Sequence, residues 1–540
     1  MRWVDWLKLV SGLLFRVRAA GVFGWVCAIM FGGGSDGGKR EQGSKRVVVV
    51  GAGLIGVCTG YFLAKEGYDV TIVDENERVA QGTSYSNAGR FCPTKISTYP
   101  LANAHVLKQV LTYPATVVSR LMWRQEENQE KNLLEATGDI PSSVTLSSVF
   151  IRWGLWYARG CTPARYEFNN KLFRRITLVS NEATRDLMEG LPRGLDSIDF
   201  RPDNLWLYGT KESLGLSIKA TQGASQSGFA NWEVLDCEEC SKRYPYLKHY
   251  LARIAQTENM HPSCVLAHDD YTVDAYKFAK EVAKCALTYK NPVKFRFKTL
   301  VEGFVLDENK KATGIIVAGQ EEPIDADHIV LCCGPQAQPF VLKHFGIDLY
   351  IQGLRGCAID LYGVKNGPTV SISDMVCGAL NYQTTPYADN RVRLIGFADF
   401  VPIPENQDGS GPLDKVSGNP DYEKILLERT KLVFPDMTWT GMRAPWCGIR
   451  PVTPDSLPIL GLVPPTQNVW LNVGHGSLGW TFAAGTALLL TREILTADNK
   501  LVHNSYVDNL TSRYGLESCS PFSVKRFFAK SFFTRAWFER

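Results

Sequence analysis

The feature that most constrains the fold is a glycine turn within KRVVVVGAGLIGVCTGYFLAKEGYDVTIVDE (45–75). The β-branched run 47–50 is typical of a buried parallel strand, and residues 54–65 have helical spacing. Residues 68–73 predict a second strand, which ends at Asp74. A Gly-x-Gly-x-x-Gly turn between a strand and a helix, with an acid after the next strand, predicts a dinucleotide-binding βαβ unit.

Each residue of this turn has a physical role. Gly51 permits the tight turn. Gly53 lets a pyrophosphate approach the backbone amides at the start of the helix, where the helix dipole favours negative charge. Gly56 lets helix and strand pack closely, and Asp74 can accept hydrogen bonds from both ribose hydroxyls. The pattern fits FAD and NAD equally well.

A second glycine turn, NVGHGSLGWTFAAG (472–485), lies near the C-terminal end. Residues 469–473 are predicted as a strand and 480–495 as a helix. FAD places its reactive ring far from its adenine, so a second part of the chain must hold that ring. Amides at the start of this helix can donate to the flavin N1–C2=O edge, where negative charge accumulates on reduction. The second turn therefore favours FAD over NAD.

Four motifs, in this order, carry a family resemblance: KRVVVVGAGLIG (45–56), TSYSNAG (83–89), CGIRPVTPDSLPILG (447–461) and NVGHGSLGWTFAAG (472–485). Over about residues 45–497 the chain resembles the D-amino-acid oxidase superfamily of FAD enzymes. It is most similar to the bacterial D-amino-acid dehydrogenase small-subunit type. The resemblance is much looser in the middle of the chain than at its two ends.

The resemblance implies an α/β (α+β) two-domain fold. A Rossmann-like FAD-binding domain would be assembled from the discontinuous segments 45–97, 262–346 and 441–497. A substrate domain built on an antiparallel sheet would comprise 98–261 and 347–440. The ends remain as a basic, apolar targeting or membrane-contact extension with a linker (1–44) and as a basic aromatic C-terminal tail (498–540).

The resemblance also implies which residues hold FAD. They are Gly51, Gly53, Ile55, Gly56 and Asp74 at the first turn, Ser84, Asn87, Gly89, Val301 and Gly334 in the middle, and Gly474, Gly476, Leu478, Gly479 and Thr481 at the second turn. Asn87 is also a residue type that turns favour for its tolerance of unusual backbone angles. No histidine occurs between Thr83 and Arg90, where histidyl-flavin members carry their attachment, so FAD is expected to bind non-covalently.

Arg450, in the GIRP motif, is the expected substrate-binding residue. In similar enzymes the arginine of this motif holds the substrate carboxylate over the flavin, and a guanidinium can grip a carboxylate with two hydrogen bonds. The structural alternative is an ion pair with Asp455. His475, between two glycines, is a second candidate, either as a flavin-edge contact or as a group that tunes proton release. A satisfied structural histidine is nearly as plausible.

These residues predict FAD-dependent oxidative deamination of an amino acid, in the D-series by resemblance, to a 2-oxo acid and ammonia. Hydride would move to flavin N5, and the electrons would pass to a quinone or another carrier. Two alternatives stay open. One is a flavin oxidase that uses oxygen on a secondary or L-amino acid, and the other is a flavoprotein assembly factor for a respiratory complex.

Two positions depart from the bacterial dehydrogenases. Those proteins usually have NAGQ where this chain has NAGR, which puts Arg90 beside the expected flavin contacts. A second cation there could shift substrate preference toward acidic side chains, or it could pair with an acid or point away. The segment DMVCGA (374–379) lacks the family's more polar sequence, so the roof of the pocket is not defined.

Composition excludes several other classes. The 540 residues are 45% hydrophobic and 21% charged, which indicates a folded protein of more than one domain. Residues 1–45 carry seven Lys/Arg and three Asp/Glu, so they account for the whole net charge of +4 and leave no basic body for nucleic acid. The fourteen cysteines have no repeating spacing and indicate reduced thiols. CEEC (237–240) alone offers too few ligands for a metal.

The two ends indicate targeting or membrane contact. The first eighteen residues are apolar, basic and almost free of acids, as in a mitochondrial presequence. The thirteen uncharged residues that follow are fewer than the ~20 that a membrane-spanning helix needs, although an interfacial anchor elsewhere in the cell is an alternative. The last twenty residues interleave six Phe and one Trp with five Lys/Arg, which suits a lipid headgroup boundary or a docked C-terminal helix. We expect a mitochondrial protein, in contact with the inner membrane.

Overall fold

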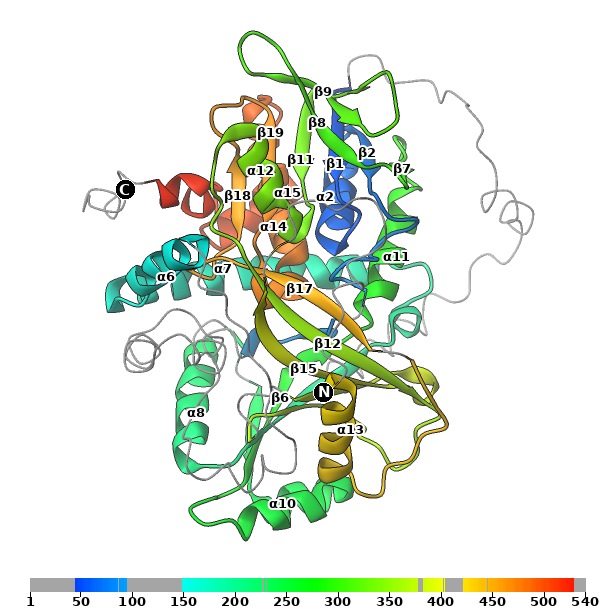
Figure 1. Ribbon diagram of the computed structural model, residues 1–540, viewed down its shortest axis with the longest axis vertical. Helices are drawn as coiled ribbons and strands as arrows, with labels where there is room; N and C mark the ends of the chain where they lie inside the picture. Colours follow the sequence, from blue (N-terminus) through cyan, green and yellow to red (C-terminus); the bar gives the residue numbers. More distant parts are fainter. Residues whose placement is uncertain are drawn as a thin grey trace. The chain divides into compact units, whose positions relative to one another are not determined.

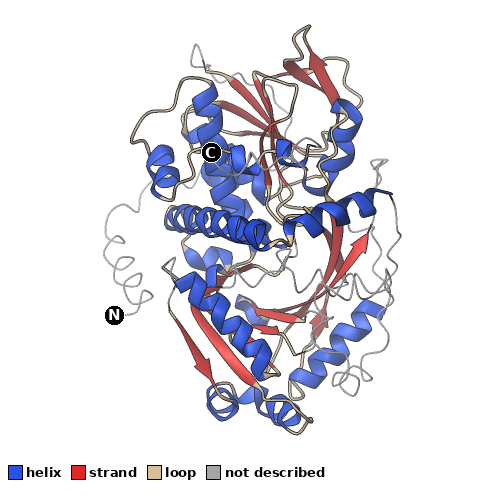
Figure 2. Ribbon diagram, turned by 90° about the vertical axis from the view of Figure 1, so that its left-hand side faces the viewer, coloured by secondary structure: helices blue, strands red, loops and turns tan. Residues whose placement is uncertain are grey.

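The computed structural model describes residues 44–85, 87–94, 148–225, 228–229, 231–376, 382–401, 403, 421–443 and 445–528. The described strands form three sheets (Figures 1 and 2). The described α-helices are α2 (Leu54–Lys65), α6 (Ser148–Gly160), α7 (Pro163–Glu189), α8 (Lys211–Ser225), α9 (Cys237–Arg243), α10 (Lys248–Ala255), α11 (Ala275–Ala286), α12 (Ala337–Phe345), α13 (Asp421–Val433), α14 (Gly479–Ala497) and α15 (Tyr506–Arg513).

A six-stranded sheet is built around the first glycine turn. Its order is β18-β19-β11-β1-β2-β7, and all neighbours are parallel except β18 and β19. Val47 and Val49 belong to one hydrophobic core and Val48 to another, so both faces are buried and the strand is continuously apolar. The strands are β1 (Arg46–Val50), β2 (Asp69–Val73), β7 (Lys294–Arg296), β11 (His328–Leu331), β18 (Ile459–Leu462) and β19 (Val469–Val473).

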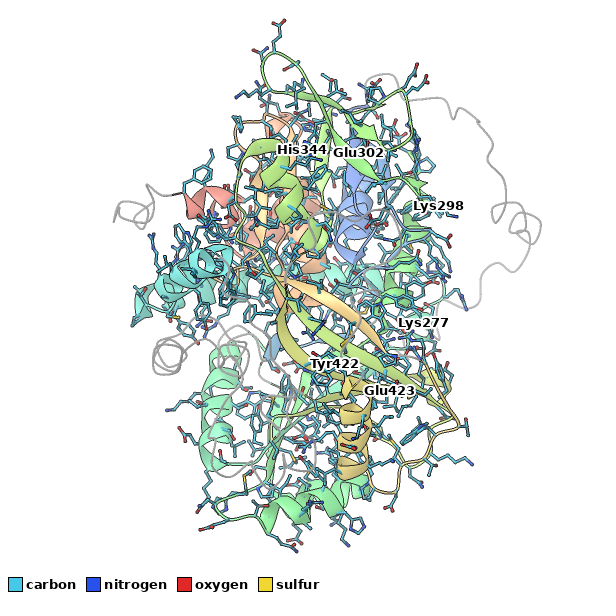
Figure 3. The ribbon with its side chains drawn as sticks, in the orientation of Figure 1. Lys277, Lys298, Glu302, His344, Tyr422 and Glu423 are labelled. Carbon is cyan, nitrogen blue, oxygen red and sulfur yellow. A yellow bond between two sulfur atoms is a disulfide. The ribbon has the colours of Figure 1, made fainter. Side chains whose placement is uncertain are left out.

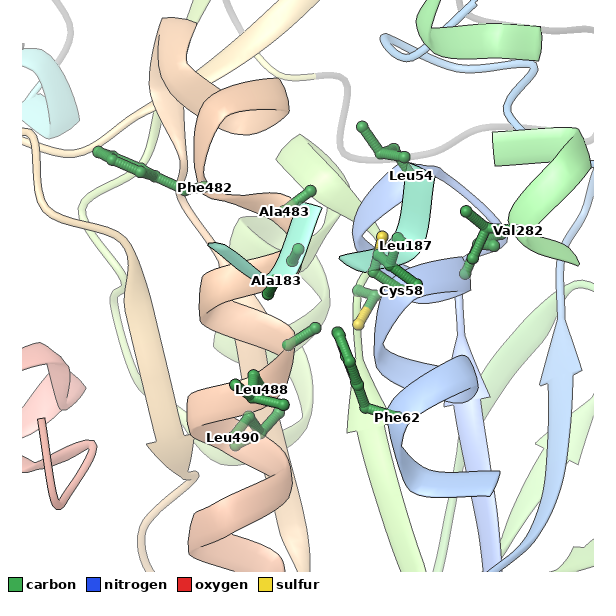
Figure 4. Packing of buried hydrophobic residues seen from close by; sticks show 14 of the residues in the cluster. Leu54, Cys58, Phe62, Ala183, Leu187, Val282, Phe482, Ala483, Leu488 and Leu490 are labelled. Atoms are coloured by element: carbon green, nitrogen blue, oxygen red, sulfur yellow. The ribbon is translucent and has the colours of Figure 1, made fainter. Parts of the chain in front are cut away.

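Helices cover one face of this sheet and a small sheet covers the other. Figure 4 shows side chains of the helical layer from α2, α7, α11 and α14, among them Phe62, Leu187, Val282 and Leu488. On the opposite face lie α12 and a three-stranded antiparallel sheet, β8 (Val301–Leu306), β9 (Ala312–Val317) and β10 (Ile324–Asp325). The first glycine turn is thereby held between two hydrophobic cores.

A ten-stranded sheet follows the path β16-β12-β15-β14-β13-β4-β6-β3, with β17 paired to β12 and β5 to β6. The expected antiparallel pairing holds except between β13 and β4, which are parallel. Side chains from α10 and α13 bury one of its faces. The strands are β3 (Arg90–Phe91), β4 (Arg201–Tyr208), β5 (Trp232–Leu235), β6 (Ser263–Thr272), β12 (Gln352–Tyr362), β13 (Ser371–Asp374), β14 (Gln383–Pro386), β15 (Val392–Val401), β16 (Gly441–Met442) and β17 (Trp446–Val452).

Local predictions from the glycine motifs are confirmed: α2 has the predicted bounds, and Val469–Val473 is a strand. Every strand of the six-stranded sheet comes from the three segments expected to form the FAD domain. However, β6 and β17 also come from those segments and belong to the large sheet. Residues from Ser44 onward form one compact unit, and the division into two domains remains a prediction.

Residues 498–528 pack on the body and do not extend from it as a tail. Tyr506 of α15 donates a hydrogen bond to Asp186 of α7 at 2.6 Å. Buried Arg526 pairs with Asp455 at 2.8 Å, and Phe522 and Phe527 are buried beside it. The described part of the last twenty residues is therefore docked, as in the alternative to membrane contact, but it forms two 3-10 turns, and Phe528 is exposed while Phe522 and Phe527 are buried.

The remaining targeting and membrane expectations fall on residues 1–43 and 529–540, which lie outside the described ranges. Among the helices that the structure describes, none has the length and apolar composition that crossing a bilayer requires.

The expectation of reduced thiols is wrong for one pair, because Cys357 and Cys447 form a disulfide. They lie directly opposite each other on β12 and β17, although 90 residues separate them in sequence. The ten other cysteines in the described ranges are thiols. Cys237 and Cys240 lie in α9, and the described residues contain no group of three or more His, Cys, Asp or Glu that could hold a metal ion.

We predict that Gly56→Ala destabilises the fold. An added Cβ would lie 1.8 Å from the carbonyl oxygen of Gly51, and a rigid turn cannot move away from it. The free energy of unfolding should fall by about 2 kcal/mol or more, measured by urea denaturation. The matched control is Gly154→Ala in α6, where a Cβ meets no atom within 4 Å and the change should be neutral or stabilising by up to about 1 kcal/mol. Equal stability of the two variants would contradict this explanation.

Candidate active site

A cavity of about 700 Å³ runs from the first glycine turn to the large sheet. Both candidate catalytic residues, Arg450 and His475, line it. The expected cofactor residues in its wall are Gly51, Gly53, Ile55, Asp74, Ser84, Asn87, Gly89, Val301, Gly334, Gly476 and Gly479. The other four, Gly56, Gly474, Leu478 and Thr481, are not among the residues that line the cavity.

In the first glycine turn, the position of Gly51 is crowded by protein atoms, whereas the position of Gly53 is open toward the cavity. At Gly51, φ is +106° and a Cβ would lie 2.7 Å from the carbonyl oxygen of Cys332, so only glycine fits. At Gly53 a Cβ would meet only Ser84 Oγ, at 3.5 Å. Asp74 accepts hydrogen bonds from the Ala52 amide at 2.6 Å and the Asn76 amide at 2.9 Å. The carboxylate therefore also fixes the turn, and its ribose contact stays a prediction.

The loop 82–90 connects the first turn to the large sheet. Ser84 Oγ accepts a hydrogen bond from the Leu54 amide at 3.1 Å. Asn87 Oδ1 accepts one from the Gly89 amide at 2.8 Å, so Asn87 is a turn residue as well as a cavity residue. At Gly89, φ is +65° and a Cβ would lie 2.1 Å from the Val273 carbonyl oxygen. This backbone can approach the cavity only with glycine at that position.

The second glycine turn brings the start of α14 to the cavity. Gly476 and Gly479 line the cavity, whereas Gly474 has a structural role, since φ is +75° and a Cβ would lie 2.8 Å from the side chain of Thr453. Leu478 and Thr481 are buried, and Leu478 packs in the helical core. The helix start therefore faces the cavity through its glycines and Trp480, while Leu478 anchors it in the core.

His475 is held by its neighbours. Its Nε2 is 3.1 Å from Thr486 Oγ1, and its backbone bridges to Val452 of β17. Burial lowers the pKa of His475 to about 3, so the imidazole is neutral at physiological pH. This geometry favours the structural alternative over a group that tunes proton release.

Arg450 lies on β17 opposite Leu354, with its guanidinium across Gly356 of β12. Its Nη1 donates to the carbonyl oxygen of Phe397 at 3.2 Å. Phe397 has φ of +71°, a rare backbone conformation for a bulky residue, and its ring stacks on Tyr422 of α13 (Figure 3). The packing of that ring therefore holds a strained carbonyl in place against Arg450. Asp455, the structural partner considered for Arg450, forms its ion pair with Arg526.

The sequence did not identify the residues of the large sheet that line the cavity. Strand register joins Trp446, Ala358, Ile395, Gln383, Ser373 and Trp206 in one row across neighbouring strands. Of these, Trp446, Ile395 and Gln383 line the cavity. Trp446 directly precedes the CGIRP motif and could have been suspected. Nothing in the sequence marks the other two, because their position depends on strand pairing.

Polar atoms in the wall fit a bound cofactor. Asn472 Oδ1 and Trp480 Nε1 are buried, belong to cavity-lining residues and have no hydrogen-bond partner among the described residues. Buried polar atoms normally have partners, so a ligand with polar edges fits beside them. Residues of both glycine turns line this one cavity, as the binding of a single FAD molecule requires.

A family profile described as FAD dependent oxidoreductase matches residues 46–493. A protein of Dechloromonas aromatica (strain RCB) named D-amino acid dehydrogenase is 28% identical over 461 residues, which cover 83% of this chain and 96% of that protein. This family match makes FAD the cofactor of the protein.

Solved structures share the fold. Glycine oxidase from Geobacillus kaustophilus has a TM-score of 0.56 at 18% identity, covering 89% of this chain and 99% of that one. L-amino acid deaminase from Proteus myxofaciens, solved with anthranilate, has a TM-score of 0.55 at 14% identity, covering 90% and 94%. At these identities the likeness concerns the fold alone.

We predict that Gly356→Ala displaces Arg450 without unfolding the protein. An added Cβ would lie 2.2 Å from Arg450 Nη2, and the end of a long side chain can move away from it. The variant should keep its flavin absorbance but lose at least about tenfold in kcat/KM, since a charged hydrogen bond contributes about 1.5–3 kcal/mol. The control is Gly441→Ala on β16, where a Cβ would meet only the Tyr362 side chain at 3.8 Å. Unchanged kcat/KM in Gly356→Ala would contradict the role of Arg450.

We predict that His475 makes the fold sensitive to acid. The unfolded chain protonates this histidine near pH 6.5, whereas the folded chain does so only near pH 3. Its contribution to stability is therefore complete above pH 6.5 and is lost as pH falls toward 3, by about 2 kcal/mol between pH 6.5 and 5. His475→Asn should reduce the difference in free energy of unfolding between pH 7 and pH 5 by about that amount. An equal difference in both proteins would contradict it.

Proposed function

We propose that this chain, which belongs to the FAD dependent oxidoreductase family, is a dehydrogenase that oxidises the CH–NH2 group of a D-amino acid, in line with its relatives named D-amino acid dehydrogenase. When bound, FAD would supply the acceptor for a hydride from Cα, and water would hydrolyse the released imino acid to a 2-oxo acid and ammonia. One observation carries the proposal: Arg450 lies across Gly356 in the same cavity that both glycine turns line.

Arg450 supplies the grip on the substrate. Gly356 and Gly448, which also line the cavity, have no side chains, so a carboxylate can reach the guanidinium. The hydrogen bond to the carbonyl oxygen of Phe397 fixes Nη1 of the Arg450 guanidinium. A bidentate contact with the substrate carboxylate would then limit rotation of the substrate and orient its Cα–H.

Proton handling needs no dedicated base in this site. The amine must lose its proton before oxidation, and His475 is buried, hydrogen-bonded to Thr486 and neutral at physiological pH. The chain therefore contributes orientation and exclusion of water, through Trp446 and Ile395 in the wall. The substrate is expected to bind as the free amine or to lose its proton to solvent on binding.

Handedness and electron acceptor are parts of the proposal that rest on the sequence. The D-series is supported by the relative named D-amino acid dehydrogenase. The basic, apolar first eighteen residues and the aromatic, basic residues 529–540 support three further parts of the proposal. These are a quinone or another membrane carrier as acceptor, a mitochondrial location and peripheral contact with the inner membrane.

Deletion of 1–43 and 529–540 should release the protein into the soluble fraction while the docked residues 498–528 stay in place. Sedimentation of the deleted form with membranes would count against contact through the ends.

We predict that D-amino acids, but not L-amino acids, reduce the flavin. The purified holoenzyme would be titrated under anaerobic conditions with both series, and the flavin band should bleach only with the D-series. The reduced flavin should then be reoxidised faster by a soluble quinone analogue than by oxygen. Arg450→Ala should retain flavin and lose bleaching at the same substrate concentrations.

Other outcomes would select other functions. Bleaching by L- or secondary amino acids, followed by fast reoxidation with oxygen, would replace the dehydrogenase with an oxidase. A flavin band that no amino acid bleaches, in a protein whose Arg450→Ala variant behaves like the wild type, would indicate a flavoprotein assembly factor.

A further inference from the structure

We propose that Arg90 binds the side-chain carboxylate of the substrate, so that the preferred substrate is a dicarboxylic amino acid. The inference rests on the proposed function for its reaction, but the binding of a second carboxylate can be tested independently of it. Its basis is a buried guanidinium in the cavity wall whose charge is not matched by a carboxylate among its described contacts.

Arg90 lies at the end of the loop 82–90, where this loop joins the large sheet. It begins β3 directly after the cavity-lining run Asn87–Gly89, and it lines the same cavity as Arg450. The residue is 8% exposed. Its guanidinium therefore lies at the inner wall of the site and not at the protein surface.

The contacts of Arg90 are neutral. Nη1 donates to Ser373 Oγ, and the guanidinium lies 4.6 Å from the ring centroid of Trp206. Nε and Nη2 are buried and have no hydrogen-bond partner in the described part of the chain. A buried guanidinium without its hydrogen bonds is costly. A carboxylate accepts two parallel hydrogen bonds from such a fork and also supplies the missing charge.

Asp270 is the acidic group to weigh against this interpretation. It lies on β6 two residues before Thr272, which pairs with Arg90 across the ladder. Its carboxylate accepts hydrogen bonds from Thr94 Oγ1 at 2.7 Å and from Trp206 Nε1 at 3.4 Å. Asp270 thus orients the indole that stacks on Arg90, and the test below separates that structural role from recognition of a ligand.

The spacing across the sheet suits a short diacid. Arg450 lies over Gly356 of β12 and Arg90 contacts Ser373 of β13, with only β15 and β14 between these strands. Three strand spacings amount to about 14 Å across the sheet, and the two-residue offset of Gly356 from Ala358, which is in register with Ser373, brings the separation of the two strand positions to about 16 Å. Two guanidinium–carboxylate contacts of about 4 Å each, added to roughly 5 Å between the carboxylate carbons of an extended glutamate, give about 13 Å, and the long arginine side chains can close the remaining ~3 Å. Ile395 and Gln383, in the wall between the two arginines, would face the methylene groups.

The test compares D-glutamate with D-glutamine, which has the same shape and no charge on its side chain. Wild-type holoenzyme should favour D-glutamate at least about tenfold in kcat/KM, the effect of one charged hydrogen bond. Arg90→Gln should abolish or reverse that preference, and Arg90→Lys should restore part of it. Arg90→Met, which keeps an unbranched apolar side chain beside Trp206 and removes the charge, replaces Arg90→Gln if the latter does not retain flavin.

A binding measurement keeps this proposal distinct from the proposed reaction. Glutarate should raise the melting temperature of the wild-type holoenzyme more than butyrate does, and the difference should vanish in Arg90→Gln. A wild type that D-amino acids reduce, but that prefers D-glutamine, would overturn the dicarboxylate proposal and leave the proposed reaction standing. Loss of the glutarate effect in Arg90→Gln, with no reduction by any amino acid, would support the carboxylate site and refute the reaction. Equal stabilisation of both proteins by glutarate would overturn the role of Arg90.

Discussion

The active site depends on a buried ion network that joins the large sheet to the cofactor-binding region. Arg393 of β15 grips Asp360 of β12 with two hydrogen bonds, at 2.7 and 3.1 Å, and donates a third to the carbonyl oxygen of Asn87 at 3.0 Å. Arg391 of the same segment donates to Asp274 at 2.6 Å, and Asp274 caps the start of α11. One group of charges therefore fixes the relative positions of Asn87 in the cavity-lining loop, α11, which covers the six-stranded sheet, and strands β12 and β15.

This ion network holds the loop and strands of the cavity wall in one arrangement. Burial by itself would raise the pKa of Asp360, but Arg393 and its neighbours outweigh burial and hold this pKa at about 2. The carboxylate is thus charged at any physiological pH, and loss of a partner would leave a buried charge at a cost of about 3–5 kcal/mol. Lys277 of α11 (Figure 3) extends the network to Asp199 at 2.7 Å. A displaced loop would have to break several such pairs at once, so the cavity wall is fixed before any ligand binds.

How far the sequence could predict this site depends on how local each feature is. The first turn, α2 and β19 follow from short-range rules, since Gly56 is required by the Gly51 carbonyl oxygen of the same turn and Gly51 by its own φ of +106°. Arg450 was found by its motif, but the strained carbonyl of Phe397 that holds it could not be, since it depends on a register shift between β12 and β15. The same holds for the Cys357–Cys447 disulfide and for Ile395 and Gln383, which meet only through strand pairing. Leu478 and Thr481 belong to the motif, yet α14 turns them into the core.

The partner of each buried arginine indicates whether that arginine has a structural role or a role in ligand recognition. Arg393 and Arg429 both have aspartate partners, Asp360 and Asp374, within 2.7 Å. Arg90 is in the large sheet with Arg393, whereas Arg429 lies on α13, and the contacts of Arg90 in the described structure are a hydroxyl and an indole face. Burial of a guanidinium costs desolvation free energy. A carboxylate of the protein can offset this cost permanently, or a carboxylate of a ligand can offset it on binding. An anionic substrate would give Arg90 the carboxylate contact that Arg393 and Arg429 receive from aspartates.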